Sequence, residues 1–328
     1  MHILIVHDSI IPALRYGGTE RVIWYLGKEL VKLGHEVSYL VKKGSHCDFG
    51  NVYFINPLLP LAQQIPENTD VAHFNNRPPD TPIAVPYIVT MHGNMNEETE
   101  LDANTVFVSK NHAERFGSAS FVYNGLDWDD YGKPDINAER NYFHFLGHAA
   151  WRVKNVRGAI QAVTAIPHER LFVLGGSRLN IKMGFRLTMH PRVKFCGMVG
   201  GEKKLSLLQH SKGLVFPVRW HEPFGLALTE SLYFGCPVFG TPYGSLPEII
   251  HAGVGYLSNK PEELTRAMKE AASYSRARCH EYARDCFNAK NMALNYLEKY
   301  NKVLNNQPLN STRPKLQKQN DSKFLAWA

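Results

Sequence analysis

Two successive series of short apolar segments alternate with helix-compatible segments along this chain. The first series opens with His2–His7, an apolar run typical of a buried parallel strand. The loop Asp8–Gly18 follows, and from Thr19 the apolar residues recur at helical spacing until Gly34, before a second strand at Glu36–Val41. Because parallel neighbouring strands are joined through a crossover helix, this order predicts an α/β unit built on a parallel sheet.

The alternation restarts in the second half of the chain, with a strand at Phe143–Gly147 and a helix at Val156–Ala165. Between the two series, residues 124–141 are polar and turn-rich, which is typical of a linker. We therefore predict two Rossmann-like domains that face a cleft, the N-terminal one over residues 1–130 and the C-terminal one over residues 140–287.

The C-terminal end of the chain changes character after a long helical stretch. Residues 276–304 are helix-compatible throughout, whereas the tail, residues 305–328, is polar, basic and without periodicity. The tail is predicted to be disordered in solution. A solvated tail is favoured over one whose basic and aromatic residues contact an anionic membrane.

Composition narrows the functional classes. The 44% hydrophobic and 20% charged residues are typical of a globular protein, and no run of apolar residues is long enough to cross a membrane. The first strand begins at residue 2, which leaves no room for a signal peptide, and the five cysteines form no CxxC pair. Both observations favour a reduced cytoplasmic location without a zinc site. The net charge of +7 favours anionic partners, but no recognition helix or aromatic signature indicates nucleic acid.

The stretch Arg219–Ile250 contains the strongest functional pattern. A loop, a helix start near Leu226 and a strand at Pro237–Gly240 follow one another, as at a ligand site on the carboxyl edge of a parallel sheet. Glu222 and Glu230 flank the helix start, where carboxylates are suited to accept hydrogen bonds from hydroxyls. The backbone N–H groups of three residues at that helix start can bind an anion: Phe224, Gly225 and Leu226. A ligand that carries an anion with hydroxyls on both sides has the composition of a sugar nucleotide. The alternative interpretation is an ordinary loop with two surface glutamates.

Other candidate residues follow predicted strands. Gly17-Gly18 lies before the first helix, where glycines allow a ligand close to the backbone, although a simple turn is the alternative. His92 ends an apolar strand and can bind or polarise a hydroxyl, or serve only as a structural hydrogen-bonding group. Three basic residues after the first strand of the second domain can neutralise a diphosphate, or form a solvated loop: His148, Arg152 and Lys154. Backbone groups near Val199 are candidates to receive a base.

Together these motifs resemble the retaining nucleotide-sugar glycosyltransferases of family four, which have the GT-B fold. The resemblance covers about residues 2–300 and is most specific in HEPFGLALTE, where Glu222 and Glu230 form an E-x7-E motif. Weaker motifs in the same order support it: Gly17-Gly18-Thr19-Glu20, Gly34-His35-Glu36-Val37, Met91-His92-Gly93, Val108-Ser109-Lys110, Asn124-Gly125-Leu126-Asp127, Lys154-Asn155 and Pro247-Glu248.

The resemblance implies roles for the site residues. Glu222 would contact the hydroxyls of the transferred sugar and Glu230 the ribose, while Lys154 would take the role of the phosphate-binding lysine. The backbone at Phe224, Gly225 and Leu226 would bind sugar and phosphate, Gly18 would meet the diphosphate, and His92 would lie near the sugar or acceptor. The resemblance also implies that the last helix, about residues 288–304, packs back on the first domain. Where the family usually has an arginine this chain has His148, and Arg152 is the alternative source of that charge.

The function implied is metal-independent transfer of a sugar from a nucleotide diphosphate-sugar, UDP before GDP, to a glycan, glycolipid or small-molecule acceptor. No cofactor is expected, because the first strand is not followed by the G-x-G-x-x-G of dinucleotide enzymes. The implied setting is bacterial lipopolysaccharide, capsule or glycolipid assembly, in the cytoplasm or peripherally on the inner face of the membrane. Two alternatives stay open: an epimerase or hydrolase on the same fold, and a non-catalytic sugar-nucleotide-binding protein.

Overall fold

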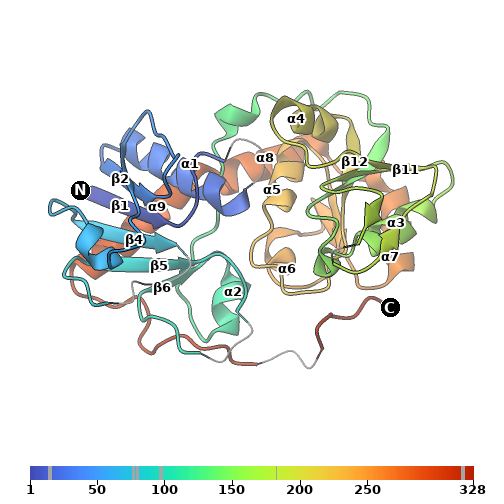
Figure 1. Ribbon diagram of the computed structural model, residues 1–328. Helices are drawn as coiled ribbons and strands as arrows, with labels where there is room; N and C mark the ends of the chain where they lie inside the picture. The colour runs from blue at the N-terminus through green and yellow to red at the C-terminus, as the bar shows by residue number, and fades with distance from the viewer. Residues whose placement is uncertain (14–16, 76–77, 79–80, 96–98, 182, 319–321) are drawn as a thin grey trace. The chain divides into compact units, whose positions relative to one another are not determined.

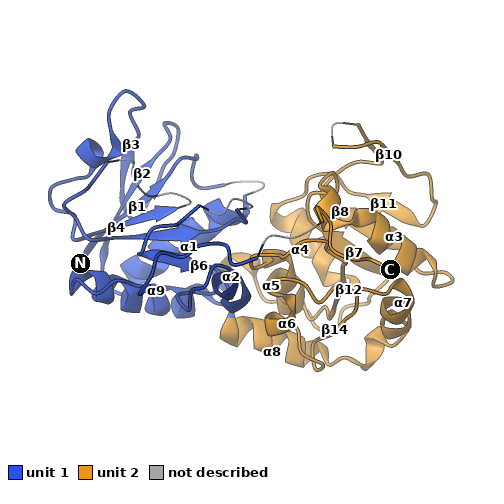
Figure 2. Cartoon of the chain, turned by 90° about the horizontal axis from the view of Figure 1, so that it is seen from below, with its two compact units in different colours: residues 1–13, 17–128, 287–319 blue, residues 14–16, 129–286, 320–328 orange. Residues whose placement is uncertain are grey.

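The computed structural model describes residues 1–13, 17–75, 78, 81–95, 99–181, 183–318 and 322–328. These residues divide into two compact units, coloured separately in Figure 2. Unit 1 contains the described residues within 1–128 and 287–318, and unit 2 contains 129–286 and 322–328. The segment interpreted as a linker is therefore divided between the units.

Each unit is built on a six-stranded parallel sheet (Figure 1). In unit 1 the strand order is β3-β2-β1-β4-β5-β6, and in unit 2 it is β11-β8-β7-β12-β13-β14. Both orders place the first strand of the unit in the middle of its sheet with later strands added on both sides, as in Rossmann-like folds. This confirms the predicted pair of α/β sheets.

The strands of unit 1 are β1 (His2–His7), β2 (Glu36–Val41), β3 (Asn51–Phe54), β4 (Val71–Asn75), β5 (Tyr87–Met91) and β6 (Thr105–Phe107). Its helices are α1 (Gly18–Lys32), the short η1 (Leu61–Gln64), α2 (Lys110–Arg115) and α9 (Ala289–Leu304). The helix α1 packs against β2 and α9, and α9 also packs against β5 (Figure 1).

The sheet strands of unit 2 are β7 (Tyr142–Leu146), β8 (Leu171–Leu174), β11 (Val193–Phe195), β12 (Ser211–Phe216), β13 (Val238–Gly240) and β14 (Gly255–Leu257). A separate hairpin is formed by β9 (Leu179–Asn180) and β10 (Arg186–Leu187). The helices are η3 (Arg152–Lys154), α3 (Val156–Thr164), α4 (Gly201–Gln209), α5 (Leu226–Tyr233), α6 (Leu246–Ile249), α7 (Pro261–Lys269), η4 (Ala271–Ser273) and α8 (Arg276–Cys286). One further short helix, η2 (Trp128–Tyr131), lies at the boundary between the units.

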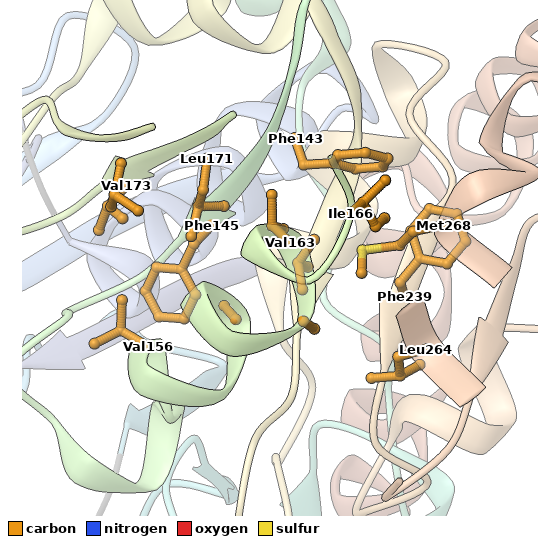
Figure 3. Close-up of a cluster of buried hydrophobic side chains, with 14 of the residues drawn as sticks. Phe143, Phe145, Val156, Val163, Ile166, Leu171, Val173, Phe239, Leu264 and Met268 are labelled. Carbon is orange, nitrogen blue, oxygen red and sulfur yellow. The ribbon is translucent and has the colours of Figure 1, made fainter. Parts of the chain in front are cut away.

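The two faces of the unit 2 sheet are packed differently. Phe143 and Phe145 of β7 belong to an apolar core with α3 and α7, as Figure 3 shows for Val156 and Val163 of α3. Because side chains alternate along a strand, His144 between them lies on the opposite face. There its ring nitrogens meet Ser211 Oγ at 2.6 Å and Ser231 Oγ of α5 at 2.8 Å.

Unit 1 also has a buried histidine on one face of its sheet. His73 of β4 contacts the hydroxyls of Thr90 in β5 at 2.7 Å and of Tyr300 in α9 at 2.8 Å. Tyr296 of α9 also lies 3.0 Å from Thr90 Oγ1. These bonds fix α9 on unit 1, although His73 and Tyr300 are 227 residues apart in the sequence.

The sequence predicts one helix-compatible stretch over residues 276–304, but the structure breaks it between α8 and α9. The carbonyl of Phe287 accepts the Leu126 N–H at 3.1 Å, and the Ala289 N–H donates to the Leu126 carbonyl at 2.9 Å. The Asn288 side chain caps α9 by accepting the N–H of Asn291 at 2.8 Å. Backbone pairing with the distant segment at Leu126 therefore interrupts the helix at this point. Helix propensity alone does not predict such an interruption.

The tail also differs from its predicted disorder, because the described part follows a defined path on each unit. On unit 1, the Asn310 side chain donates to the carbonyls of Ala103 and Thr105 at 2.9 Å, and Leu316 is buried. On unit 2, the Trp327 ring packs against the apolar core and its Nε1 donates to Gln161 at 3.1 Å. A few apolar side chains and amide groups thus order a tail that has no periodic pattern.

The contacts of Trp327 predict that the tail stabilises unit 2. Trp327→Ala removes apolar contacts with the core and the bond to Gln161, and we expect a loss of about 1–3 kcal/mol, below the cost for a fully buried Trp. Calorimetric melting would show a lower Tm for Trp327→Ala and an unchanged Tm for Lys323→Ala, an exposed residue of the same tail. Equal melting of both variants and the wild type would support a disordered tail instead.

The buried histidines predict proton uptake on unfolding in mild acid. Burial lowers the pKa of His73 to about 3. The pKa of His144 is also lowered to about 3, mainly by burial and to a smaller extent by the positive charge of Arg140. In the unfolded chain the histidine pKa is about 6.5, so the stabilisation is complete above that pH and is lost as the pH falls towards 3. At pH 5, His144→Gln should therefore take up about one proton fewer on unfolding than the wild type. Potentiometric titration of the native and the guanidinium-unfolded protein would measure this, and equal uptake would contradict it.

Candidate active site

The loop before α5 is held in one conformation by the turn that follows β13. Gly225 caps α5 with φ +83, in the left-handed region that favours glycine, and the helix starts at Leu226 as predicted. The N–H of Ser245 donates to the Glu222 carbonyl at 2.9 Å, and Ser245 Oγ donates to the Phe224 carbonyl at 2.7 Å. At Gly244, φ is +64 and a Cβ would lie 2.2 Å from the Glu222 nitrogen, so only glycine fits. The backbone of the motif is therefore preorganised.

A second loop, which follows β7, is joined to the motif loop through its backbone. The Arg219 N–H donates to the Val153 carbonyl at 2.7 Å, and Asn155 Nδ2 donates to the Pro217 carbonyl at 3.0 Å. Asn155 has φ +55 and also caps α3, because its side chain accepts the Gly158 N–H at 3.1 Å. These bonds bring Lys154 next to the motif loop.

Lys154 and Glu222 form an ion pair with 2.6 Å between Nζ and Oε2. Both side chains are largely buried, at 13% and 7% exposure, so the pair has little screening by solvent. Trp220 Nε1 donates to the same carboxylate oxygen at 2.8 Å. The Lys154 ammonium also lies 4.9 Å from the centre of the Trp220 ring and 5.1 Å from that of Phe216. The site thus holds a cation over two aromatic faces beside a carboxylate.

Glu230, the second motif glutamate, is buried in α5 with a different set of partners. Its Oε1 accepts a hydrogen bond from the Tyr131 hydroxyl at 2.7 Å and forms an ion pair with Lys204 of α4. The Lys204 ammonium lies 5.2 Å from the centre of the Tyr131 ring. Each glutamate of the motif is therefore paired with one lysine from another element of unit 2.

The remaining candidates of unit 2 lie in other surroundings. His148 stacks on Trp151, with ring centroids 5.6 Å apart, and its buried Nδ1 meets no hydrogen-bond partner among the described residues. Arg152 lies over the ring of Phe324 from the tail, 4.8 Å from its centre, and Arg219 lies 5.3 Å from the same ring. Val199 is buried just before α4. The structure thus gives Arg152 an aromatic partner from the tail, while its phosphate role stays a prediction.

In unit 1 the predicted residues lie at the start of α1 and directly after β5. Gly17 caps α1, which starts at Gly18, and a Cβ at Gly17 would lie 2.6 Å from Glu20 Oε2. His92 follows β5, and its Nε2 lies 2.8 Å from Asn75 Oδ1 at the end of β4. Asn75 Nδ2 donates in turn to the carbonyl of Val6 in β1 at 3.1 Å. The Asn75 amide therefore links the ends of three strands and orients His92.

His92 and the nearby His7 are neutral groups at pH 7. Burial is the main cause that holds the pKa of His92 well below its ordinary value, and the mutual repulsion that protons on His92 and on His73, His7 or His112 would experience acts in the same direction. Burial also lowers the pKa of His7, although Glu20, 4.0 Å from its Nε2, opposes this. A neutral imidazole can donate one hydrogen bond and accept another, so His92 is suited to binding a hydroxyl.

Several residues of these surroundings were not singled out in the sequence: Tyr131, Lys204, Trp220, Asn75 and His7. Trp220 was detectable, since it lies two residues before Glu222. Lys204 and Tyr131 gave no local signal, because the packing of α4 and of the segment after Trp128 brings them to Glu230.

Neither a metal centre nor a membrane-spanning helix is found in the part of the chain that the structure describes. There, no group of three or more His, Cys, Asp or Glu side chains is arranged to hold a metal ion. No helix among these residues combines the length and apolar character needed to cross a bilayer.

Comparison with known proteins shows which family and which solved structures this chain resembles. Residues 127–285 match the family model described as glycosyl transferases group 1. The chain is 24% identical over 348 residues to N-acetyl-alpha-D-glucosaminyl L-malate synthase of Bacillus anthracis, a match that covers 79% of this chain and 89% of that protein.

Among solved structures, AviGT4, a glycosyltransferase involved in avilamycin A biosynthesis, is similar with a TM-score of 0.73 and 21% identity, over 92% of this chain and 98% of that one. Anabaena Alr3699/HepE, solved in complex with UDP-glucose, is similar with a TM-score of 0.66 and 15% identity, over 92% and 100% of the two chains. Residues 127–285 are therefore similar to the glycosyl transferases group 1 domain, and the chain has the GT-B fold of the solved glycosyltransferases.

Proposed function

We propose that this protein is a retaining glycosyltransferase that moves a sugar from a nucleotide diphosphate-sugar to an acceptor hydroxyl. The observation that carries the proposal is the Lys154–Glu222 pair, with 2.6 Å between Nζ and Oε2. Its two loops follow β7 and β12, which are parallel neighbours, so both lie at the carboxyl edge of the unit 2 sheet. Ligands of open α/β sheets bind at this edge.

In the proposed mechanism Lys154 stabilises the leaving diphosphate. Its ammonium is held by Glu222 and by the faces of Trp220 and Phe216, so the cation is in place before the substrate binds. Charge that develops on the leaving diphosphate is stabilised by a cation that needs no reorganisation. The first turn of α5 adds backbone N–H groups at the positive end of the helix dipole, where an anion is favoured.

The two glutamates orient the donor through its hydroxyls. Glu222 is fixed by Lys154 and Trp220, and in the proposal its carboxylate accepts hydrogen bonds from the transferred sugar. Glu230 is oriented by Tyr131 and Lys204 and takes the ribose. Such positioning reduces the entropy that is lost when the reacting groups are aligned.

Unit 1 supplies the groups proposed for the acceptor and the diphosphate. His92, neutral and oriented by Asn75, is proposed to bind a hydroxyl, and the backbone at Gly17-Gly18, at the start of α1, is proposed to bind an anion. No cofactor or metal is required in this scheme, because the leaving diphosphate itself takes the acceptor proton.

UDP is the proposed nucleotide, in preference to GDP. The UDP-glucose complex of HepE, a protein with the same fold, supports this preference. The proposed acceptor is a glycan or glycolipid hydroxyl in bacterial lipopolysaccharide, capsule or glycolipid assembly on the cytoplasmic side. A small hydroxy acid is the second candidate, which the name of the Bacillus anthracis malate synthase supports.

Nucleotide binding provides the first test. Thermal melting with UDP, GDP and ADP should show the largest stabilisation with UDP, about 2.7 kcal/mol at a hundredfold excess over its Kd. UDP should stabilise the wild type more than its 2′,3′-dideoxy analogue does. In Glu230→Gln this difference in stabilisation should shrink, because the ribose hydroxyls lose their carboxylate partner. Stabilisation by GDP alone would overturn the choice of base, and an unchanged difference would remove Glu230 from the ribose.

Substitutions in the ion pair separate catalysis from stability. Lys154→Met leaves a buried carboxylate unpaired and should cost about 3 kcal/mol of stability. The double variant Lys154→Met/Glu222→Gln should recover much of this, whereas each single and the double variant should lose at least about tenfold in turnover, or about 1.4 kcal/mol. Turnover is measured as UDP release from UDP-glucose over a panel of acceptors.

The Lys212–Glu169 pair of unit 2 supplies the matched control. It is a more exposed pair, at 32% and 20%, so Lys212→Met should change neither turnover nor stability by much. Wild-type turnover in the double variant of the Lys154–Glu222 pair would contradict the proposed site. Nucleotide binding without turnover on any acceptor would instead favour a non-catalytic binding protein.

A further inference from the structure

The β9–β10 hairpin of unit 2 has an unusual distribution of side chains. The two strands are antiparallel, with Leu187 opposite Leu179 and Arg186 opposite Asn180. Large apolar residues occupy every second position of the sequence from 179 to 189, interleaved with polar residues and glycine. Because side chains alternate between the faces of a strand, Leu179 and Leu187 share one face of the hairpin, and Asn180 and Arg186 share the other.

The polar face of the hairpin points into unit 2. Arg186 is 6% exposed and Thr188 is 8% exposed. The Arg186 guanidinium lies 4.8 Å from the centre of the Phe195 ring and donates to the Ser177 carbonyl at 2.9 Å. The usual arrangement, with apolar residues inside and polar residues outside, is therefore reversed in this element.

The apolar face points outward. Its six residues have exposed fractions between 46% and 75%, and they make up six of the fifteen large exposed apolar residues in the described part of the chain: Leu179, Ile181, Met183, Phe185, Leu187 and Met189. Figure 2 shows the hairpin projecting from the rest of unit 2. Exposed apolar residues gathered in one element indicate an interaction surface, whereas single ones do not.

Positive charge accompanies this apolar face. The sequence from Arg170 to Gly201 contains no Asp or Glu but includes six Lys and Arg residues. Two exposed arginines hold the hairpin itself: Arg157 donates to the Phe185 carbonyl at 2.6 Å, and Arg178 donates to the Thr188 carbonyl at 3.2 Å. A partner for this surface must combine an apolar interior with negative charge.

We propose that the β9–β10 hairpin docks unit 2 on an anionic lipid bilayer. Phe185, Met189 and their neighbours insert between the acyl chains, and the arginines contact the anionic headgroups. A second copy of this chain fits less well, because two such faces would bring like charges together. This surface is separate from the basic tail, whose Trp327 packs on unit 2.

Vesicle binding tests the proposal on the full chain. Co-sedimentation should show binding to phosphatidylcholine vesicles that contain phosphatidylglycerol, little binding to phosphatidylcholine alone, and weaker binding at high salt. The double variant Phe185→Ser/Met189→Ser should bind at least about tenfold more weakly, because both apolar contacts are lost. Its melting temperature should equal that of the wild type, since both side chains are exposed.

A matched variant controls for the loss of exposed apolar surface in general. Tyr256 in β14 and Leu294 in α9 are exposed by 39% and 44%, and Tyr256→Ser/Leu294→Ser should bind vesicles as the wild type does. Wild-type binding by the hairpin variant would overturn the proposal. So would a dimer in sedimentation velocity that the hairpin variant abolishes, because it would identify a second copy as the occupant. The assay does not use turnover, so its failure leaves the proposed glycosyl transfer untouched.

Discussion

The ion pair between Lys154 and Glu222 is the constraint around which unit 2 is arranged. A buried carboxylate with 7% exposure is costly unless a cation and hydrogen-bond donors meet it. The lysine reaches it because the loop after β7 is bonded to the loop after β12, through Arg219 to Val153 and through Asn155 to Pro217. The same bonds that satisfy this pair therefore preorganise the proposed donor site, and the buried pair of Glu230 with Lys204 repeats the arrangement.

On one face of each sheet, buried polar groups are paired by hydrogen bonds that also fix how neighbouring elements pack. His144 and His73 lie where strand alternation turns them away from the apolar cores, and both are satisfied by hydroxyls from neighbouring strands and helices. In unit 1 these hydroxyls come partly from α9, so a polar contact helps to determine where the last helix packs. Directional hydrogen bonds give such a contact a specificity that apolar burial lacks.

Much of the fold could be predicted from local pattern. The helix start at Leu226, the first strand at His2–His7 and the two parallel sheets all follow from periodicity and from turn residues. The break between α8 and α9 and the path of the tail could not, because each depends on a partner far away in the sequence. The β9–β10 hairpin pairs locally, but its strands are only two residues long, which is too short for a periodic pattern to identify them. The hairpin was also concealed by its reversal, since an alternating pattern does not say which face is buried.

The sequence by itself determined the fold class, the E-x7-E motif and the residue types of the proposed donor site. It did so because helix and strand periods, glycines and spacing are local properties. Only the tertiary structure decided which groups meet: Lys154 with Glu222, Lys204 and Tyr131 with Glu230, and Arg152 with Phe324 of the tail. Such pairings depend on the burial of charge and on which loops lie at one sheet edge, and neither is encoded by neighbouring residues alone.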